Sequence, residues 1–376
     1  YCLKTDLMYI PQDCICKQLG FHTALAVVLI EASGTTYSVR SLLMRRFEAF
    51  QTDRLRQLRT GRRANQRQRK PQETILTAHH SELPKGIHRS VKLPDAKLGE
   101  LWDSIILEQS IKDQLLSQAI VNFTVRPKVS RNVLPLHGTV MLVGVPGTGK
   151  TSLARGLAHK TAECFKGTKF TLLEVDPHAL GSAMMGKTQK AVSDLFSQTI
   201  AESAMAGRTI VLLDEVETLA ADRAKLSLEA NPVDVHRATD AVLVQLDALA
   251  ESHPNLLFIA TSNFPQAVDS AFTSRCDLVL EIPLPNKHAC EQILRSCLRG
   301  LGETFHSIGL LPGVSGFSSV VEAAVGLDGR AIRKAVASAL TMRKEVAMNP
   351  MELTVADLLA ATKAAKAIRM TKEKAK

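Results

Sequence analysis

Aromatic residues are scarce in this chain of 376 residues: they make up 4% of it, with one Trp and three Tyr. Proteins that bind single-stranded nucleic acid without sequence preference stack the bases on aromatic side chains. The composition therefore argues against such a stacking platform. Because 45% of the residues are apolar, the chain can still bury a sizeable core, and its length is enough for two domains.

Long apolar runs are also missing. The longest one near the N-terminus is ALAVVLI, residues 24–30, which is far short of the ~20 residues that span a bilayer. It follows Lys17, as a signal-peptide core would, but Glu31 stands where a small-residue cleavage site should begin. The sequence therefore predicts neither secretion nor a membrane partner.

Cysteines are few and scattered. There are seven of them, an odd number, and Cys14 and Cys16 lack the spacing of a zinc-ligand pair, with no later Cys/His pair to complete a site. A zinc site is therefore not favoured. The simplest interpretation is a protein of a reducing compartment, the cytoplasm or, in a eukaryote, the nucleus.

Positive charge is concentrated in one segment. Residues 40–70 contain eleven Arg or Lys residues and only Glu48 and Asp53 as acids, a net charge of +9 out of +10 for the whole chain. Such a run indicates either a tail that binds nucleic acid or another anionic surface, or a solvated, disordered segment; we favour the second.

The N-terminal part of the chain shows no sustained helical or strand period. We therefore expect residues 1–81 to be a basic segment that is disordered or, because the chain begins with Tyr1 rather than Met, not authentic. Residues 82–100 carry two prolines and two glycines, which predicts an extended linker.

A regular alternation of strands and helices follows, and we assign residues 101–284 to an α/β domain. Five continuous apolar stretches, each typical of a buried parallel strand, occupy residues 139–144, 170–176, 209–215, 255–263 and 277–282. The helices expected between them span residues 150–160, 188–205 and 234–250. This order predicts a parallel five-stranded sheet covered by helices on both faces, with the functional site at the carboxyl ends of the strands.

The strands stop after residue 284, and residues 285–376 are predicted to form a small all-helical domain. Its helices are expected at residues 287–300, 329–347 and 354–366. Thr354 and Asp357 have the spacing of a capping box at the start of the last one.

A glycine-rich loop joins the first strand to the first helix of the α/β domain. It fits the pattern G-x-x-x-x-G-K-[ST] without a mismatch through Gly144, Val145, Pro146, Gly147, Thr148, Gly149, Lys150 and Thr151. The glycines let backbone N–H groups point at phosphate oxygens, and the helix that follows adds the positive end of its dipole. Lys150 would neutralise the β- and γ-phosphates, and Thr151 would offer a hydroxyl to Mg²⁺.

Polar residues follow two later strands. Asp214 can hold Mg²⁺ through water, and the adjacent Glu215 can orient and deprotonate an attacking water. Asn263 could position that water over the γ-phosphate. The pair of carboxylates beside a phosphate loop favours ATP hydrolysis over nucleotide binding alone.

Two arginines complete the candidate site. Arg275 precedes the last strand, where its guanidinium could reach the phosphates bound by a neighbouring subunit. Arg330 begins a helix of the C-terminal domain and could reach over the phosphates of its own chain.

Residues 100–366 resemble an AAA+ ATPase and, more closely, the pachytene checkpoint protein 2 family with its bacterial HORMA-associated relatives. The stretches that carry the resemblance are LWDSIIL (101–107), VGVPGTGKTSLARGLA (143–158), LLDEVETLAADR (212–223), NPVDVHRATDAVLVQLD (231–247), ATSNFPQAVDSAF (260–272) and GLDGRAIRK (326–334). The resemblance implies an α/β P-loop core with a helical lid, assembled into a homohexamer. It also implies that Mg²⁺ and ATP drive the unfolding of part of a HORMA-domain protein threaded through the ring.

The same resemblance implies roles for individual residues. It makes Asp214 and Glu215 the Walker B pair, Asn263 sensor 1, Arg275 the arginine finger and Arg330 sensor 2. Ile105 or Ile106 would contact the adenine. Met184 and Met185, between Gly181 and Gly186, would form the pore loop, where AAA+ unfoldases usually present an aromatic and an apolar residue. Met can still grip a peptide, without a rigid ring.

Two alternatives stay open. A motor or loader of the same superfamily could act on nucleic acid through residues 40–70, although the core shows no basic stripe. A nucleotide-gated scaffold would bind ATP without turnover, but the intact Glu215 argues against it.

Overall fold

The structure is a computed structural model of the chain, and it describes residues 83–176, 188–222 and 232–374. Two features singled out by the sequence, the basic segment within residues 1–81 and the pair Met184–Met185, lie outside the described residues.

A six-stranded sheet forms the centre of the first domain, with the strand order β1-β3-β4-β5-β2-β6. The strands are β1 (Ile87–Leu93), β2 (Thr139–Val143), β3 (Phe170–Val175), β4 (Arg208–Leu213), β5 (Leu256–Ser262) and β6 (Leu278–Glu281). All neighbours run parallel except β1, which pairs antiparallel with β3. The middle strands β4, β5 and β2 therefore bring their carboxyl ends to one edge, as expected for a parallel sheet.

The sixth strand corrects two sequence predictions, the purely parallel five-stranded sheet and the linker at residues 82–100. β1 lies within that predicted linker and pairs with β3 from Ile87 to Leu93. It went unrecognised because an edge strand has one partner only, so it keeps polar residues such as Arg89 and lacks the continuous apolar pattern of the inner strands.

A helix also begins inside the predicted linker. In α3 (Ala96–Ser104), the Asp95 side chain accepts a hydrogen bond from the backbone N–H of Leu98 at 3.1 Å. Gly99, one of the two glycines that predict a linker here, lies within this helix and faces the His159 ring so closely that an added Cβ would lie 2.7 Å from Nε2. The glycine is required by close packing between helices rather than by an irregular backbone.

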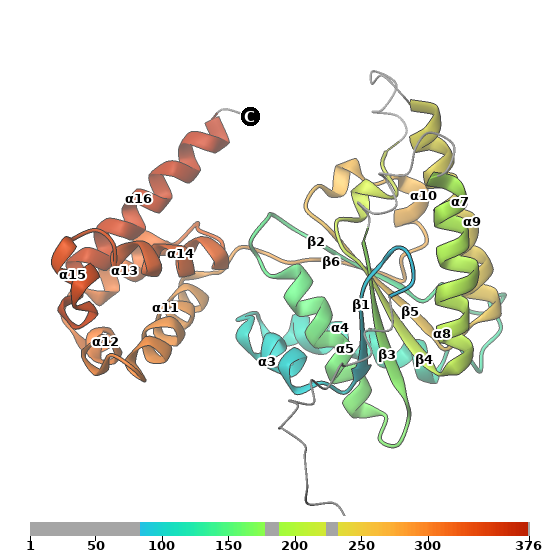
Figure 1. The fold of residues 1–376 in the computed structure, drawn as a ribbon, viewed down its shortest axis with the longest axis horizontal. Coiled ribbons are helices and arrows are strands. Elements are labelled where there is room, and N and C mark those ends of the chain that lie inside the picture. Colours follow the sequence, from blue (N-terminus) through green and yellow to red (C-terminus); the bar gives the residue numbers. More distant parts are fainter. Residues whose placement is uncertain (1–82, 177–187, 223–231, 375–376) are drawn as a thin grey trace, which may run out of the picture. The chain divides into compact units, whose positions relative to one another are not determined.

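Helices cover both faces of the sheet (Figure 1). One face packs against α3, α4 (Gln109–Thr124) and α5 (Lys150–Cys164), and the other against α7 (Thr188–Asp194), η2 (Leu195–Ile200), α8 (Ala201–Ala206) and α9 (Pro232–Ser252). Successive strand residues point to opposite faces, so Met141 belongs to one core cluster and Leu142 to the other. Burial on both faces explains why β2, β4 and β5 read as continuous apolar runs.

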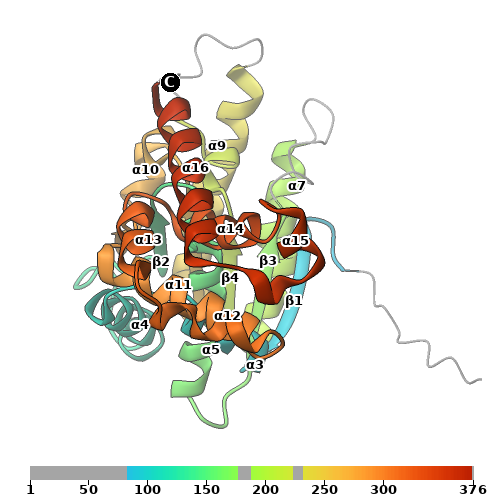
Figure 2. The ribbon, with the colours of Figure 1, turned by 90° about the vertical axis from the view of Figure 1, so that its left-hand side faces the viewer.

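The C-terminal domain is helical, as the sequence predicted (Figure 2). It comprises α11 (Lys287–Gly302), α12 (His306–Leu310), η6 (Leu311–Gly313), α13 (Phe317–Ala324), α14 (Gly329–Ala339), α15 (Lys344–Met348), η7 (Pro350–Glu352) and α16 (Val355–Lys374). These helices surround their own apolar core, which includes Leu294, Val320 and Ile332. We refer to this domain as the lid.

Two details of the lid test the sequence predictions. The capping box at α16 is confirmed: Asp357 Oδ2 accepts from the Thr354 backbone N–H at 2.9 Å, and the Asp357 N–H donates to Thr354 Oγ1 at 3.3 Å. The prediction of a single helix at residues 329–347 is wrong, because the chain forms two helices there, α14 and α15. Between them, Arg343 makes a bidentate ion pair with Asp357, with two hydrogen bonds of 2.8 Å each.

Among the described residues no single helix is long and apolar enough to cross a membrane. One bent pair, His306–Gly313 with Phe317–Ala324, passes by length and composition alone, and its apolar residues, such as Ile308 and Val320, belong to the buried core of the lid.

Candidate functional site

The glycine-rich loop runs from the end of β2 to the start of α5, as predicted. Gly144, Gly147 and Gly149 have φ values of 148°, 88° and 93°, which L side chains rarely adopt. All three also have no room for a side chain: a Cβ would lie 2.5 Å from the Ile282 backbone oxygen at Gly144, collide with the Asp328 carboxylate at Gly147, and lie 2.5 Å from Ile105 Cδ1 at Gly149. The loop is therefore a cradle whose shape requires glycine at these three positions.

The first turn of α5 leaves its backbone N–H groups available. Gly149 stands at the N-cap, and no side chain caps the helix. Free N–H groups and the positive end of the helix dipole together form an anion site. The local sequence thus builds a phosphate-binding loop without any charged side chain other than Lys150.

Lys150 is 5% exposed, and its amino group donates to the backbone oxygens of Gly144 at 2.8 Å and Val145 at 3.0 Å. Burial lowers the pKa of Lys150, while the nearby carboxylates of Glu217 and Asp214 act in the opposite direction. The ammonium group is thus held at the loop, with opposite charges close by, where it can meet the terminal phosphates of a nucleotide.

Thr151 and Asp214 meet across the sheet edge. Thr151 Oγ1 donates to Asp214 Oδ1 at 2.8 Å, and Thr261 Oγ1, from β5, donates to the same oxygen at 2.5 Å. Hydroxyl and carboxylate oxygens are the donors Mg²⁺ prefers, and it usually completes its shell with water and substrate phosphates. Thr151 and Asp214 therefore fit the predicted Mg²⁺ site, which needs no larger cluster; the described residues contain no group of three His, Cys, Asp or Glu suited to a metal.

Glu215 and Asn263 also meet, from β4 and β5. Asn263 Nδ2 donates to Glu215 Oε1 at 3.2 Å, and the Glu215 backbone N–H donates to Thr261 Oγ1 at 3.2 Å. Glu215 has a φ of 51°, the one positive value at a non-glycine position in the described part of the chain. Such backbone strain persists where the surroundings enforce it, often at functional sites. At Glu215, this backbone conformation projects an exposed carboxylate beside the phosphate loop.

Sequence reasoning missed one carboxylate here. Glu217 lies in the short turn η3 (Val216–Thr218), and its Oε1 accepts from the Asn263 backbone N–H at 3.1 Å. The signal was the third acid in DEVE, two residues beyond Glu215, but only the pairing of neighbouring strand ends reveals what it contacts.

Arg275 lies at the opposite end of the sheet from the phosphate loop. It follows α10 (Ser270–Thr273) and precedes β6, and β6 runs parallel to β2, with Leu278 beside Val140. Arg275 is thus near the amino end of these strands, whereas the loop leaves the carboxyl end of β2. The five residues of β2 separate these two ends by about 16 Å. The structure does not bring Arg275 into its own chain's site, which is what an arginine acting on a neighbour requires.

The Arg275 guanidinium is held in a defined orientation. It makes two hydrogen bonds to the Asp247 carboxylate of α9, at 2.9 and 2.7 Å, and one to the backbone oxygen of Ala271 at 2.7 Å. Because the hydrogen bond from Arg275 stabilises the charged form, the pKa of Asp247 lies below its usual value. A bidentate pair of this kind fixes the plane of the guanidinium.

A cavity of about 550 Å³ adjoins the phosphate loop within the compact unit of residues 79–376. Ile105 and Ile106 line it, together with Gly147, Pro283 and the lid residue Arg330. Its volume suits a small-molecule ligand, and its apolar wall beside a phosphate loop suits a nucleobase. Both isoleucines therefore line a cavity beside the phosphate loop, and their contact with adenine stays a prediction.

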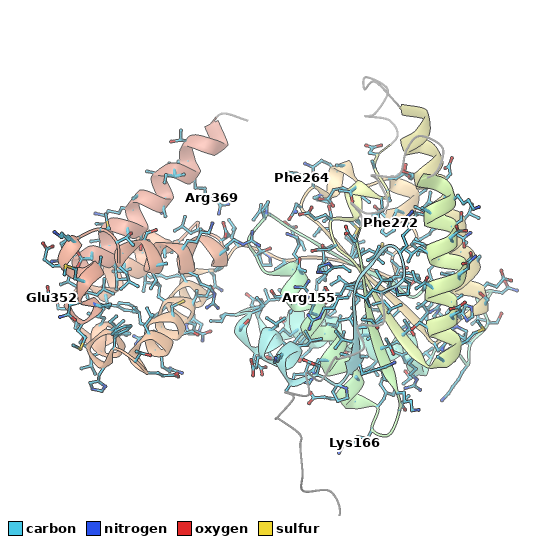
Figure 3. The ribbon with its side chains drawn as sticks, viewed as in Figure 1. Arg155, Lys166, Phe264, Phe272, Glu352 and Arg369 are labelled. Carbon is cyan, nitrogen blue, oxygen red and sulfur yellow. The ribbon has the colours of Figure 1, made fainter. Side chains whose placement is uncertain are left out.

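The lid contacts the phosphate loop directly. The Arg330 backbone N–H donates to the Gly147 oxygen at 3.2 Å. A second bond joins the lid to the end of α3, where Arg333 Nη2 donates to the Ser104 oxygen at 3.1 Å. Asp328 caps α14 and also meets Arg369 of α16 at 3.5 Å; Figure 3 shows where Arg369 projects from that helix. The exposed Arg330 side chain borders the cavity, consistent with its predicted position.

Replacing Gly147 with alanine is expected to weaken ATP binding by ~10-fold or more, about 1.4 kcal/mol. The new methyl group would displace the Asp328 carboxylate and occupy a backbone conformation with φ 88°. Titration with a fluorescent ATP analogue would measure the change. Gly167→Ala is a matched control, because Gly167 has a φ of 78° and open space around it. Equal affinities for Gly147→Ala and the wild type would contradict the cradle.

Comparisons with known proteins identify a family and several relatives. The family described as "ATPase family associated with various cellular activities (AAA)" matches residues 140–284. CD-NTase-associated protein 6 of Pseudomonas aeruginosa is 70% identical over 288 residues, which cover 77% of this chain and 95% of that protein.

More distant relatives share only the central part. The pachytene checkpoint protein 2 homolog of Arabidopsis thaliana is 36% identical over 213 residues, 56% of this chain and 45% of that protein. The human homolog is 33% identical over 234 residues, 61% of this chain and 51% of that protein. The chain thus spans about half the length of these two relatives.

Two solved structures have a similar fold. The structure of C. elegans PCH-2 matches with a TM-score of 0.61 and 25% identity, over 78% of each chain. A chain of the E. coli MS115-1 HORMA:CdnC:Trip13 complex matches with a TM-score of 0.60 and 20% identity, over 74% of this chain and 95% of that one.

Proposed function

The chain belongs to the AAA family of ATPases, in the group of CD-NTase-associated protein 6 and pachytene checkpoint protein 2, and from this premise we propose that it hydrolyses Mg-ATP as a homohexamer to remodel a partner protein. The partner we propose is a HORMA-domain protein. The proposed compartment is the cytoplasm, or the nucleus in a eukaryotic host.

One observation carries the ATPase part of this proposal: Lys150, the Thr151–Asp214 pair and the Asn263–Glu215 pair gather at one edge of the sheet. ATP would lie with its adenine against Ile105 or Ile106 and its phosphates in the glycine cradle. Thr151 and Asp214 would hold Mg²⁺, which neutralises charge on the phosphates. Glu215 would take a proton from the attacking water, and the Asn263 amide would orient that water and Glu215.

The ring supplies what a single chain lacks. Arg275 is far from its own phosphate loop and is exposed enough, at 24%, to meet another subunit. A guanidinium that arrives from a neighbour stabilises charge on the transferred phosphoryl group. This placement supports a site completed between protomers. Arg330, whose helix contacts Gly147 through the backbone, would transmit nucleotide state to the lid.

The proposal of a HORMA-domain substrate is supported by a structural neighbour whose complex contains a HORMA protein together with Trip13. By analogy with that family, Met184 and Met185 would grip the threaded segment in the pore. These two residues lie outside the described part of the chain.

Adding a candidate HORMA-domain protein should raise ATP turnover several-fold, because a gripped substrate would couple the subunits of the ring. A coupled-enzyme assay measures turnover, and an unrelated folded protein serves as the control. Glu215→Gln should capture the same partner in the presence of ATP without turnover.

The Arg-rich segment 40–70 favours a second candidate, a motor on nucleic acid. If DNA rather than the HORMA-domain protein stimulated turnover, with a steep salt dependence that is lost on deleting residues 1–80, this second candidate would replace the first.

A further inference from the structure

Glu217 is held behind the predicted catalytic pair by a single hydrogen bond. Its Oε1 accepts from the Asn263 backbone N–H at 3.1 Å. Its Oε2 is buried and has no hydrogen-bond partner in the part of the chain that the structure describes. A buried carboxylate oxygen without a donor is costly. The hydrogen bond that the described residues give this carboxylate is on the other oxygen, and it ties Glu217 to the segment that bears the Asn263 amide.

The turn that carries Glu217 is itself fixed. Val216 is fully buried, Thr218 Oγ1 donates to the Glu215 backbone oxygen at 2.9 Å, and the Leu219 N–H closes the turn on the Val216 oxygen at 2.9 Å. The turn follows Glu215 directly, so Glu217 is a rigid extension of the strand end that bears the general base.

Asn263 is held differently: Phe264 N–H donates to Ser262 Oγ at 3.0 Å, and Asn263 itself is bound by the turn that carries Glu217. It follows the last residue of β5, and the exposed Phe264 comes next (Figure 3). Its backbone N–H is bound by Glu217 and its side-chain amide by Glu215. Both acceptors, Glu215 and Glu217, therefore belong to the same short segment at the start of the turn. A charge-assisted bond to a backbone N–H is about twice as strong as a neutral one, so Glu217 restrains the backbone from which the Asn263 amide projects.

We propose that Glu217 is a positioning residue for ATP hydrolysis: it clamps the Asn263 backbone so that the amide stays in contact with Glu215. This inference rests on the proposed ATPase function. It assigns a role to a residue whose hydrogen bond goes to Asn263 and not to the phosphate loop. It predicts that the effect of Glu217 on hydrolysis runs through Asn263 rather than through its negative charge near Lys150.

The first test needs no nucleotide. Hydrogen–deuterium exchange of the peptide over residues 260–266 should be faster in Glu217→Ala than in the wild type. Glu217→Gln, whose amide oxygen can still accept from Asn263, should restore most of the protection. Glu251→Ala, on the exposed face of α9, is the control and should leave that peptide unchanged. Unaltered exchange in Glu217→Ala would overturn the proposal.

The second test is kinetic. Glu217→Ala should lower kcat by ~10- to 100-fold, the range expected for misplacing a catalytic group by about 1 Å, while the KM and the affinity for a fluorescent ATP analogue change little. Combining it with Asn263→Ala should cost no more than Asn263→Ala alone, because the two residues act as one unit. A purely structural role would instead weaken ATP binding and add to the Asn263→Ala loss.

The outcomes separate this inference from the function on which it rests. A wild-type protein that shows no ATP turnover contradicts the proposed function, and the inference with it. Turnover by the wild type that Glu217→Ala leaves unchanged, or that the double variant loses additively, contradicts the inference alone.

Discussion

Replacing Arg275 with alanine should lower ATP turnover by ~10³-fold, the lower end of the range measured for arginine fingers. The physical reason is that Arg275 lies near the amino ends of β2 and β6, while the phosphate loop lies at the carboxyl end of β2. In the proposed ring, the lost guanidinium would serve the neighbour's site. Affinity for ATP in the same chain should stay unchanged, which equilibrium titration beside a turnover assay would show.

Mixing two inactive variants gives the sharpest control for this prediction. In a ring, a Glu215→Gln protomer still offers Arg275 to a neighbour that carries Arg275→Ala and an intact Glu215. Mixed rings should recover part of the turnover, although each variant alone has almost none. Arg299→Ala, at an exposed position on α11, should behave as the wild type. Normal turnover by Arg275→Ala, or a mixture as inactive as its components, would argue against a site shared between protomers.

Replacing Glu215 with glutamine is expected to lower turnover by ~10²-fold or more while ATP binding and assembly persist. Glutamine keeps the size of the side chain and an oxygen that can accept from Asn263 Nδ2, a contact of 3.2 Å in the wild type. It cannot take a proton from water. Binding and hydrolysis should therefore separate in this variant, which is a property of a general base and not of a structural residue.

The Glu215→Gln prediction is checked by single-turnover kinetics together with sedimentation in the presence of ATP. Glu202→Gln, an exposed acid on α8, is the matched control and should leave both unchanged. If Glu215→Gln hydrolysed ATP at the wild-type rate, the general base would have to be another group, and the nucleotide-gated scaffold would also be excluded.

Local sequence was sufficient for the parts of the site that lie on one short segment. The cradle from Gly144 to Thr151 is encoded by the order of glycines, lysine and threonine, because backbone geometry and helix dipole act over a few residues only. The inner strands of the sheet were also predictable from local sequence, because strands buried on both faces consist of unbroken runs of apolar residues.

The edge strand β1 illustrates where this reasoning stops. Its sequence, IHRSVKL, has no continuous apolar pattern, and only pairing with β3 makes it a strand. Arg89 contacts Glu174 at 3.6 Å. Arg155, labelled in Figure 3, extends from α5 and binds the same carboxylate at 2.7 Å. Such long-range charge pairing leaves no periodic signal in the chain.

What the sequence determined by itself is the nucleotide-binding chemistry, because the groups that contact phosphate follow one another along the backbone. The tertiary structure decided how the remaining groups act. It set Thr151 against Asp214, Asn263 against Glu215 and Glu217, and Arg275 against Asp247 at the far end of the sheet. These pairs join residues that are tens of positions apart, and only the order in which strands lie side by side determines which of them meet.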